Sequence, residues 1–537
     1  MRNSALHIII LLLAGAITVS AQQKDTVIKT NTIEIIQSYK PEIKQHPKPE
    51  ATFSLPPADT SRPVFTYVVP QQNLNYTYSS LPLKPLALSK DTVMPPYQNY
   101  LKLGGGNLST LYFDAGIGSV HGNNYETALH LHSISQQGNI KYQQTSLTDL
   151  QADGTLHTVD NTWHASLTAL RNAWYYYGYD HNRYEHSSDS VKQVFTGARL
   201  AVDMTPAHVK NIFYHPSISA SAYNDKFKAS ETSFNFTAPF SYSVDSSLQL
   251  ELAISGALTS LSVNKQSHGN NVFAIAPGIR YTSTTFSGYA YIIPAIGQYR
   301  SYILPDIAAT YHIGKNLVAI TAGWQSKLRQ NTYEQLTTDN PYIYNTYSQR
   351  QTRTDEVYAM GEGSIGSHIA LTGRISWWQY SDLPIFLNNT YDGKQFNILY
   401  EDHLTAFSLQ GGIRYQVANA FSAGVHIASY TYYNGSLPQP WHLPGISVKG
   451  DVLFQPVPKL SITAYLYVLN DIKALDNMGQ TVTINGIFNI GGGTEYNIIR
   501  RLSVFARIDN LLNSPNVRWL GYNGYGFNIY AGVRLKF

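Results

Sequence analysis

The strongest constraint on the fold is an alternation of apolar and polar residues with a period of two. It runs from Tyr100 to the C-terminal Phe537 in segments of about nine to thirteen residues, the length that a tilted strand needs to cross a membrane. In the last segment, one face carries Phe527, Ile529, Ala531, Val533, Leu535 and Phe537, and the other carries Asn528, Tyr530, Gly532, Arg534 and Lys536. Because neighbouring side chains of a strand point to opposite faces, each such segment has one apolar and one polar face.

Charged residues keep to the polar phase of these segments. Three segments show this, each with its apolar face given first. Residues 198–204 have Ala198, Leu200, Val202 and Met204 opposite Arg199 and Asp203, and residues 248–254 have Leu248, Leu250, Leu252 and Ile254 opposite Gln249 and Glu251. Residues 502–509 have Leu502, Val504, Ala506 and Ile508 opposite Ser503, Arg507 and Asp509. A Lys or Arg on the lipid face of a barrel costs roughly 2 to 4 kcal/mol near the membrane midplane, and a soluble sandwich has no such penalty. The pattern predicts an all-β chain that folds as a transmembrane antiparallel β-barrel.

The composition fits such a wall. Charged residues make up 13% of the chain, against roughly 25% in soluble domains, and the chain holds 41 Tyr, a residue that gathers at membrane interfaces. Beyond the N-terminal segment, no apolar run reaches the length of about 20 residues that a membrane-spanning helix needs. The chain has no Cys, which excludes disulfides and thiolate metal sites. The net charge of +4 is not gathered into a basic patch, so no nucleic-acid partner is expected.

The lengths of the links between strands predict which end of the barrel faces outward. Counting back from the C-terminus, short links at Arg500–Arg501 and Pro456–Lys459 alternate with long links at Asn513–Asn523 and Asn470–Gln480. Outer-membrane barrels have short periplasmic turns and longer external loops. We therefore expect the final residue on the periplasmic side, and the spacing indicates about 22 strands, within a range of about 16 to 22.

The first residues resemble a secretory signal peptide. Arg2 gives a basic start, an apolar core runs from Ile8 to Ile17, and Val19-Ser20-Ala21 is a small-residue ending of the kind that signal peptidase cleaves. Residues 1–21 are therefore predicted to be removed after export. No Cys follows the cleavage point, so a lipoprotein is not favoured.

Residues 22–98 differ from the rest of the chain. Eleven of the 25 prolines fall between Pro41 and Pro96, which is incompatible with a regular helix or a central strand through most of this segment. We interpret it as an extended, Pro-rich periplasmic arm. The barrel is predicted to occupy residues 99–537.

The C-terminal region resembles the end of a TonB-dependent receptor barrel. Arg507-Ile508-Asp509-Asn510-Leu511-Leu512-Asn513 is followed by Gly521-Tyr522 and by the terminal strand that ends at Phe537. In that family, a strand ending of this kind precedes a long loop and a last strand closing on an aromatic residue. The resemblance implies that Phe537 is the signal read by the barrel-assembly machinery. Members also carry an N-terminal plug domain, which residues 22–98 are too short and too rich in proline to form.

Two functions are compatible with these features. The first is a channel or transporter-like barrel that passes an unidentified solute across the cell outer membrane. The second is a non-transporting barrel that serves as an anchor or scaffold of an envelope protein complex. The expected partners are the lipid of the outer membrane, the barrel-assembly machinery, and a periplasmic or envelope protein that binds residues 22–98.

The sequence contains no recognisable catalytic, cofactor-binding or metal-binding motif, so we expect no enzyme activity and no cofactor. No Ser lies in a G-x-S-x-G turn, and no H-E-x-x-H pair is present. His130 and His132 share one face of a strand and are interpreted as a lumenal or interfacial pair rather than metal ligands. Residues 175–186 hold acids, His and Tyr in an external loop that could bind a sugar or an ion, although a solvated Tyr-rich loop is the favoured interpretation.

Charged residues on the polar phase are predicted to face the lumen and to shape its interior. The candidates are Arg199, Asp203, Glu251, Arg374, Arg414, Arg507, Asp509, Arg534 and Lys536. Fixed charges of this kind can select solutes. They can equally form cross-strand ion pairs that satisfy one another inside the barrel, and the sequence leaves both interpretations open.

Overall fold

The computed structural model describes residues 99–537 apart from 210, 315–317, 345–348 and 419. The predicted signal peptide and Pro-rich arm lie outside these residues. The two helices of the described part are short, α2 (Ser188–Val191) and α3 (Tyr333–Asp339). No helix among the described residues is long and apolar enough to cross a membrane.

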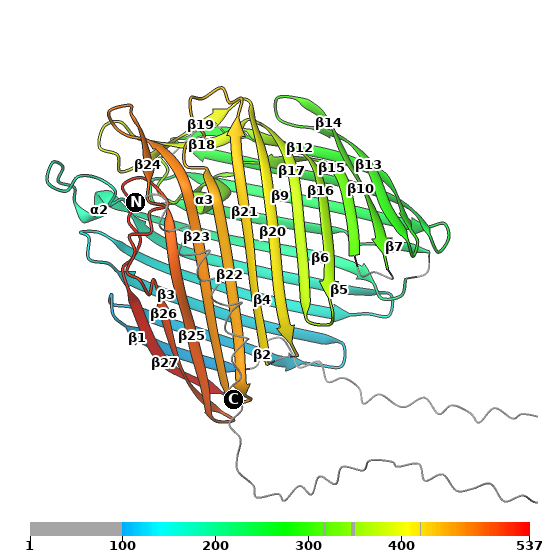
Figure 1. Cartoon of the computed structure of the whole chain (residues 1–537), viewed down its shortest axis with the longest axis horizontal. Coiled ribbons are helices and arrows are strands. Elements are labelled where there is room, and N and C mark those ends of the chain that lie inside the picture. Colours follow the sequence, from blue (N-terminus) through cyan, green and yellow to red (C-terminus); the bar gives the residue numbers. More distant parts are fainter. Residues whose placement is uncertain (1–98, 210, 315–317, 345–348, 419) are drawn as a thin grey trace, which may run out of the picture. The chain divides into compact units, whose positions relative to one another are not determined.

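The described chain forms a closed antiparallel barrel of 22 strands, as the alternation predicted (Figure 1). In chain order these are β1 (Tyr100–Gly106), β2 (Leu111–His121), β3 (Tyr125–Gln137), β4 (Gln144–His157), β5 (Asn161–Tyr175), β6 (Lys192–Pro206), β8 (Ser217–Asp225), β9 (Ser230–Ser243), β10 (Leu248–Val263), β12 (Val272–Thr282), β13 (Phe286–Ile296), β14 (Ser301–Ile313), β15 (Val318–Gln330), β16 (Gln351–Ile365), β17 (Ile369–Ser381), β20 (Leu404–Val417), β21 (Phe421–Tyr433), β22 (Pro444–Val457), β23 (Leu460–Leu475), β25 (Ile487–Ile499), β26 (Leu502–Asp509) and β27 (Asn528–Lys536).

Shorter strands extend this wall or sit in its links. The strands β7 (Ile212–Tyr214), β11 (Gln266–Gly269) and β24 (Thr481–Ile484) pair with β9, β10 and β23. A separate hairpin of β18 (Leu383–Asn388) and β19 (Phe396–Glu401) lies in the link between β17 and β20.

The ring closes between the first and last strands. β1 pairs with β2 on one side and with β27 on the other, with Tyr100 opposite Lys536 and Gly104 opposite Gly532. The seam is crowded on its inner side, because a Cβ added to Gly104 would lie 2.9 Å from the Phe505 ring. A glycine is needed here for the strands to approach one another.

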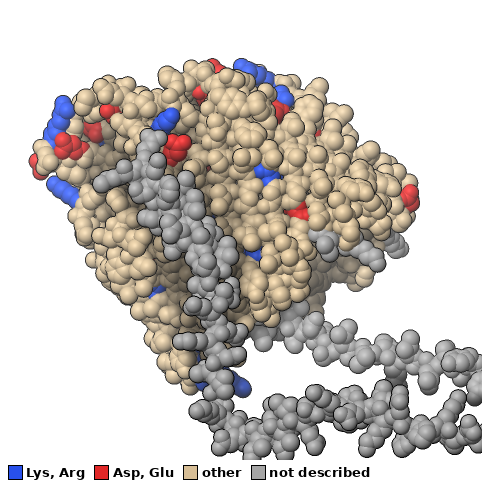
Figure 2. All heavy atoms as spheres, in the orientation of Figure 1, with Lys and Arg blue, Asp and Glu red and all other residues tan. Residues whose placement is uncertain are grey.

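Apolar side chains point outward along the whole wall, and polar ones point into the lumen. On β10, Leu250, Leu252 and Ile254 are exposed, and on β27 Val533 and Leu535 are exposed. Exposed apolar side chains in a closed barrel are the lipid-facing surface of a membrane protein. Figure 2 shows the same pattern, with few Lys, Arg, Asp or Glu side chains over the wall and more at the end with the long links.

The two ends of the barrel differ in the length of their links. At the end where β27 stops, the strands are joined by tight turns, such as the one between β25 and β26. The opposite end carries the long links, including those with α2, α3 and the β18–β19 hairpin; in Figure 1, α2 lies at the left of the barrel, and β18 and β19 lie at its top. We call this end the mouth.

Candidate functional site

Four of the nine predicted lumen charges form ion pairs across the barrel wall. Arg280 Nε lies 2.9 Å from Glu251 Oε1, and Arg374 Nη2 lies 2.6 Å from Glu356 Oε2. The remaining close pairs of this type are Arg414 with Asp451 at 2.9 Å and Arg534 with Glu495 at 3.1 Å. These contacts are what the ion-pair interpretation expects, and solute selection by the same charges stays a prediction.

The other candidates make different contacts and do not gather in one site. Asp203 accepts hydrogen bonds from His164 and His215, each at 3.0 Å, while Arg199 leaves the wall to pair with Glu334 of α3 at 2.7 Å. Three more contacts complete the set: Tyr465 donates to Asp509 at 2.6 Å, Arg507 lies 5.9 Å from the centre of the Tyr112 ring, and Lys536 donates to Asn497 at 3.2 Å. Phe537 follows β27, and its side chain is exposed.

The two histidines of β3 each contact an aspartate of a neighbouring strand. His130 Nε2 lies 2.9 Å from Asp114, and His132 Nδ1 lies 3.0 Å from Asp149. These pairs lie on the polar face of the wall, as interpreted from the sequence. Within residues 99–537, apart from the gaps named above, no group of three or more His, Asp or Glu side chains is arranged to hold a metal ion.

The links of the mouth pack on one another and form the largest buried cluster of the described chain. Segments 176–191, 331–344, 382–403 and 510–527, which we call the mouth assembly, follow β5, β15, β17 and β26. The Tyr342 and Tyr522 rings stack with centroids 3.6 Å apart, and Tyr177 contacts Tyr522 at 4.9 Å. Because these strands lie at separate positions around the ring, the segments meet across the opening rather than along the rim.

The mouth assembly corrects one interpretation of the sequence. In residues 175–186, Tyr176, Tyr177 and Tyr179 are buried rather than solvated, whereas Asp180 to Glu185 are exposed or half-buried. The rings that contact Tyr177 come from segments more than a hundred residues away, Tyr342 and Tyr522. Nothing in the local sequence distinguishes a Tyr that packs on distant loops from one that faces water.

Helix α3, which follows β15, is held against β9 by a buried carboxylate. Glu231 of β9 accepts hydrogen bonds from the backbone N–H of Tyr333 at 2.6 Å, from that of Glu334 at 3.1 Å, and from the Gln349 amide at 2.6 Å. The first N–H groups of a helix have no partner within the helix, so a negative charge there is stabilising. Together with the Arg199–Glu334 pair, this contact fixes α3 to β6 and β9.

His442, in the link between β21 and β22, joins two segments of the mouth assembly. Its Nδ1 lies 2.8 Å from the carbonyl oxygen of Phe386, and its Nε2 lies 3.4 Å from the backbone N of Leu520. Nδ1 must donate to the carbonyl, so Nε2 carries no proton and accepts from Leu520. Burial lowers the pKa of His442 to about 4, so the ring is neutral at physiological pH.

Two glycines and an arginine show how closely the segments approach. Gly521 has a φ of 86°, and a Cβ at this position would lie 2.6 Å from the carbonyl oxygen of Gly178. Arg518 donates from Nη1 to the carbonyl oxygen of His442 at 2.7 Å, and its guanidinium lies 4.3 Å from the centre of the Trp519 ring. Sequence reasoning missed these residues, although Gly521-Tyr522 lies in the segment that carries the family resemblance.

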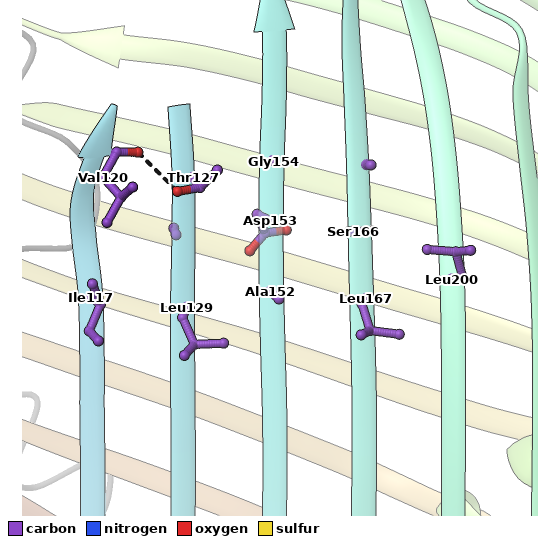
Figure 3. Close-up of a pocket in the computed structure, with 12 residues that line it drawn as sticks. Ile117, Val120, Thr127, Leu129, Ala152, Asp153, Gly154, Ser166, Leu167 and Leu200 are labelled. Carbon is purple, nitrogen blue, oxygen red and sulfur yellow. Dashed lines mark hydrogen bonds between the residues drawn. The ribbon is translucent and has the colours of Figure 1, made fainter. Parts of the chain in front are cut away.

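A shallow hollow lies on the outer wall over β2 to β6 (Figure 3). Large side chains such as Leu129, Leu167 and Leu200 surround the small residues Ala152 and Gly154. The apolar side chains belong to the lipid-facing phase of the wall, so this hollow faces membrane lipid and offers no chemistry of its own.

Comparison with known proteins supports the fold. No protein-family model matches the sequence, and no curated protein sequence matches it. Among solved structures, the chain is similar to the ferric enterobactin receptor PfeA of Pseudomonas aeruginosa (10% identity, TM-score 0.62, covering 82% of this chain and 80% of that one). It is also similar to the FrpB iron transporter of Neisseria meningitidis (10%, 0.63, 82% and 81%) and to FpvA of P. aeruginosa (8%, 0.60, 82% and 72%).

These similarities establish the fold. The closed barrel of 22 strands, with its apolar outer surface, is that of an integral outer-membrane protein. The similar structures are transport receptors rather than enzymes. Identities of 8 to 10% carry no substrate or partner from those proteins to this one.

Proposed function

We propose that this barrel passes a solute across the outer membrane through its lumen, and that the mouth assembly is the gate at the outer end. The observation that carries the proposal is the packing of segments from separate strands across the opening, with α3 fixed to β6 and β9 by Arg199 and Glu231. A barrel of this strand number encloses a wide lumen, which would leak unless something closes it. The mouth assembly supplies such a closure at one end.

Side-chain contacts supply most of what holds the gate closed, so it can open while the strands of the barrel stay paired. Its described contacts are ring packing, ion pairs such as Arg199 with Glu334, side-chain hydrogen bonds such as those of Glu231 and His442, and a few backbone hydrogen bonds such as those of Phe396. Each is worth a few kcal/mol at most, whereas opening the strand ladder would expose backbone groups to lipid.

Residues 22–98 are proposed to act at the periplasmic end. On this proposal the Pro-rich arm either occupies the lumen or docks a periplasmic partner. The similar receptors and transporters are named for ferric enterobactin, iron and pyoverdines, which makes a chelated metal one candidate cargo to assay.

The competing function is a non-transporting anchor or scaffold. The same tight mouth supports it, because buried aromatic packing around Tyr342 and Tyr522 also suits a permanently sealed barrel. In that case the arm would serve only to bind a partner.

Single-channel conductance in planar bilayers separates the two functions. We would compare the mature chain from Gln22, a variant lacking residues 22–96, and the same truncated variant carrying Glu231→Gln and Arg199→Gln to release α3. If the barrel passes a solute, the truncated variant that carries both substitutions should conduct, and the mature chain should be closed. Silence from all three variants, once each is shown to be folded, would refute passage and favour the scaffold.

A further inference from the structure

Three cations gather on the lumen side of the seam between β1 and β27, at the end of the barrel opposite the mouth. Lys102 of β1 lies directly opposite Arg534 of β27. Lys102 Nζ lies 3.0 Å from Glu495 Oε2 on β25, and Arg534 Nη1 lies 3.1 Å from Oε1 of the same carboxylate. Lys536 follows two residues after Arg534 on the same face of β27, and its Nζ donates to Asn497 of β25 at 3.2 Å. The three side chains therefore form one patch, which we call the seam patch.

A single carboxylate serves the seam patch. Glu495 is shared by the two cations that face each other across the seam. The next acid, Asp114, lies opposite Lys102 in the pairing of β1 with β2. Its oxygens are already in hydrogen-bond contact, at 2.8 to 3.0 Å, with Tyr100, His130 and Tyr112. Among the described residues, no carboxylate other than Glu495 lies within 4.0 Å of the three cations, so the patch carries an excess of positive charge.

This excess is more than a structural role needs. One cation would be enough to tie Glu495 to the seam. Like charges directly opposite each other in an antiparallel pair destabilise that pair, and Lys102 and Arg534 stand in this position. Their side chains are only 13% and 22% exposed, so water and salt screen the repulsion poorly. An anion bound on the lumen side would offset the repulsion.

The turns beside the seam patch add to its positive field. Lys459, Arg500 and Arg501 are exposed, and none of them forms an ion pair among the described residues. The backbone N–H of Asn497 donates to the Lys459 carbonyl oxygen at 2.8 Å. The backbone N–H of Lys536 donates to the Arg501 carbonyl oxygen, also at 2.8 Å. A surface that carries charges of one sign concentrates ions of the opposite sign in front of it.

We propose that Lys102, Arg534 and Lys536 form a subsite for an oxyanion, the carboxylate or phosphate group of a solute in the lumen. This rests on the proposed passage of a solute and names the chemical class of that solute. Each ammonium has three N–H donors and uses one of them in the contacts described above, so donors remain for the oxygens of the anion. The guanidinium adds a planar set of donors that suits a carboxylate or a phosphate.

Isothermal titration of the purified mature chain in detergent measures binding at the seam patch. The probes are inorganic phosphate and citrate at low ionic strength, and maltose is the neutral control. Circular dichroism first shows that each variant is folded.

The variants change the charge of the seam patch in both directions. Lys102→Gln and Lys536→Gln each remove a cation, and the second keeps a donor for Asn497, so it should leave the fold intact. Glu495→Gln removes the acid and raises the positive excess. Lys141→Gln is the matched control, because it removes an exposed cation from the link between β3 and β4, at the mouth.

We expect phosphate and citrate to bind the unmodified chain and Lys141→Gln equally, and maltose not to bind. Lys102→Gln and Lys536→Gln should each weaken anion binding about tenfold, the change that about 1.4 kcal/mol produces, whereas Glu495→Gln should strengthen it. Absence of anion binding to the unmodified chain, unchanged binding to either lysine variant, or no gain in Glu495→Gln overturns the subsite. Because titration measures binding without passage, a silent channel that still binds phosphate would refute the proposed passage alone.

Discussion

His442 makes the mouth sensitive to acid at the level of a single residue. Burial holds its pKa at about 4, below the ordinary 6.5, so the folded link excludes a proton that the unfolded link accepts. Its full contribution to stability is present above pH 6.5, falls as the pH drops from 6.5 toward 4, and amounts to about 3 kcal/mol.

We therefore predict that the segment around His442 becomes accessible to protease or to hydrogen exchange between pH 6.5 and 4. Hydrogen exchange followed by mass spectrometry measures this directly. The variant His442→Gln cannot titrate there, so subtracting its profile isolates the histidine from the carboxylates. Identical profiles for the two proteins would contradict the assignment.

Glu231 is the second residue on which the mouth depends. Glu231→Gln removes the charge that faces the first N–H groups of α3 while keeping the shape of the side chain. Since hydrogen bonds to a charged group contribute about 1.5 to 3 kcal/mol, we predict at least about tenfold faster exchange in α3. Glu185→Gln, an acid in the link of the mouth that holds α2, is the control and should leave α3 unchanged.

At the level of an element, the approach of the segments 176–191 and 510–527 depends on Gly521. Gly521→Ala should disrupt this contact for two reasons. Gly521 has a positive φ that alanine disfavours, and the added Cβ would lie only 2.6 Å from the Gly178 carbonyl oxygen. Gly479→Ala is a matched control, because Gly479 has a φ of 78° but open space around its Cβ position. Quenching of tryptophan fluorescence by acrylamide, which reports the exposure of buried Trp519, should rise in the first variant and not in the second.

The strands themselves are expected to obey the lipid and lumen phases. Leu252→Arg places a charge on the lipid face of β10, whereas Ser255→Arg places it on the opposite face of the same strand. We predict that the first variant loses roughly 2 to 4 kcal/mol of folding free energy in lipid vesicles and that the second loses much less. Urea unfolding from vesicles measures both, and equal losses would contradict the assigned phase.

The contrast between strands and links explains how much the sequence could predict. Local alternation alone assigns the lumen and lipid faces of β10 and β27, because a charge such as that of Arg534 would meet lipid if the two faces were exchanged. Other contacts join segments that are distant in the chain, such as the packing of Tyr177 on Tyr522 and the hydrogen bonds from α3 to Glu231. No local sequence pattern encodes those contacts. The charges Arg374 and Arg414 were placed in the lumen from the sequence, but their partners Glu356 and Asp451 were not identified.

For the whole molecule, the gate can be tested by locking it. The chain has no Cys, so the pair Arg199→Cys and Glu334→Cys can be bridged by a short bis-methanethiosulfonate reagent, which forms a disulfide with each thiol and releases sulfinate. If the mouth assembly opens, the bridged barrel should take up less solute in liposome swelling assays, and reduction should restore uptake. The pair Arg414→Cys and Asp451→Cys lies within the wall and should bridge without effect.

The pairing of β1 with β27 also dictates when this barrel can be completed in the cell. The strand that closes the ring onto β1 is β27, which comes after the other strands of the barrel in the chain, so a nascent chain that lacks it keeps two unpaired edges. Such edges cannot be left in lipid, where no water satisfies their backbone groups. Closure in the membrane must wait until β27 has been made and exported, and a chain that stops before β27 would lose the whole barrel rather than one strand.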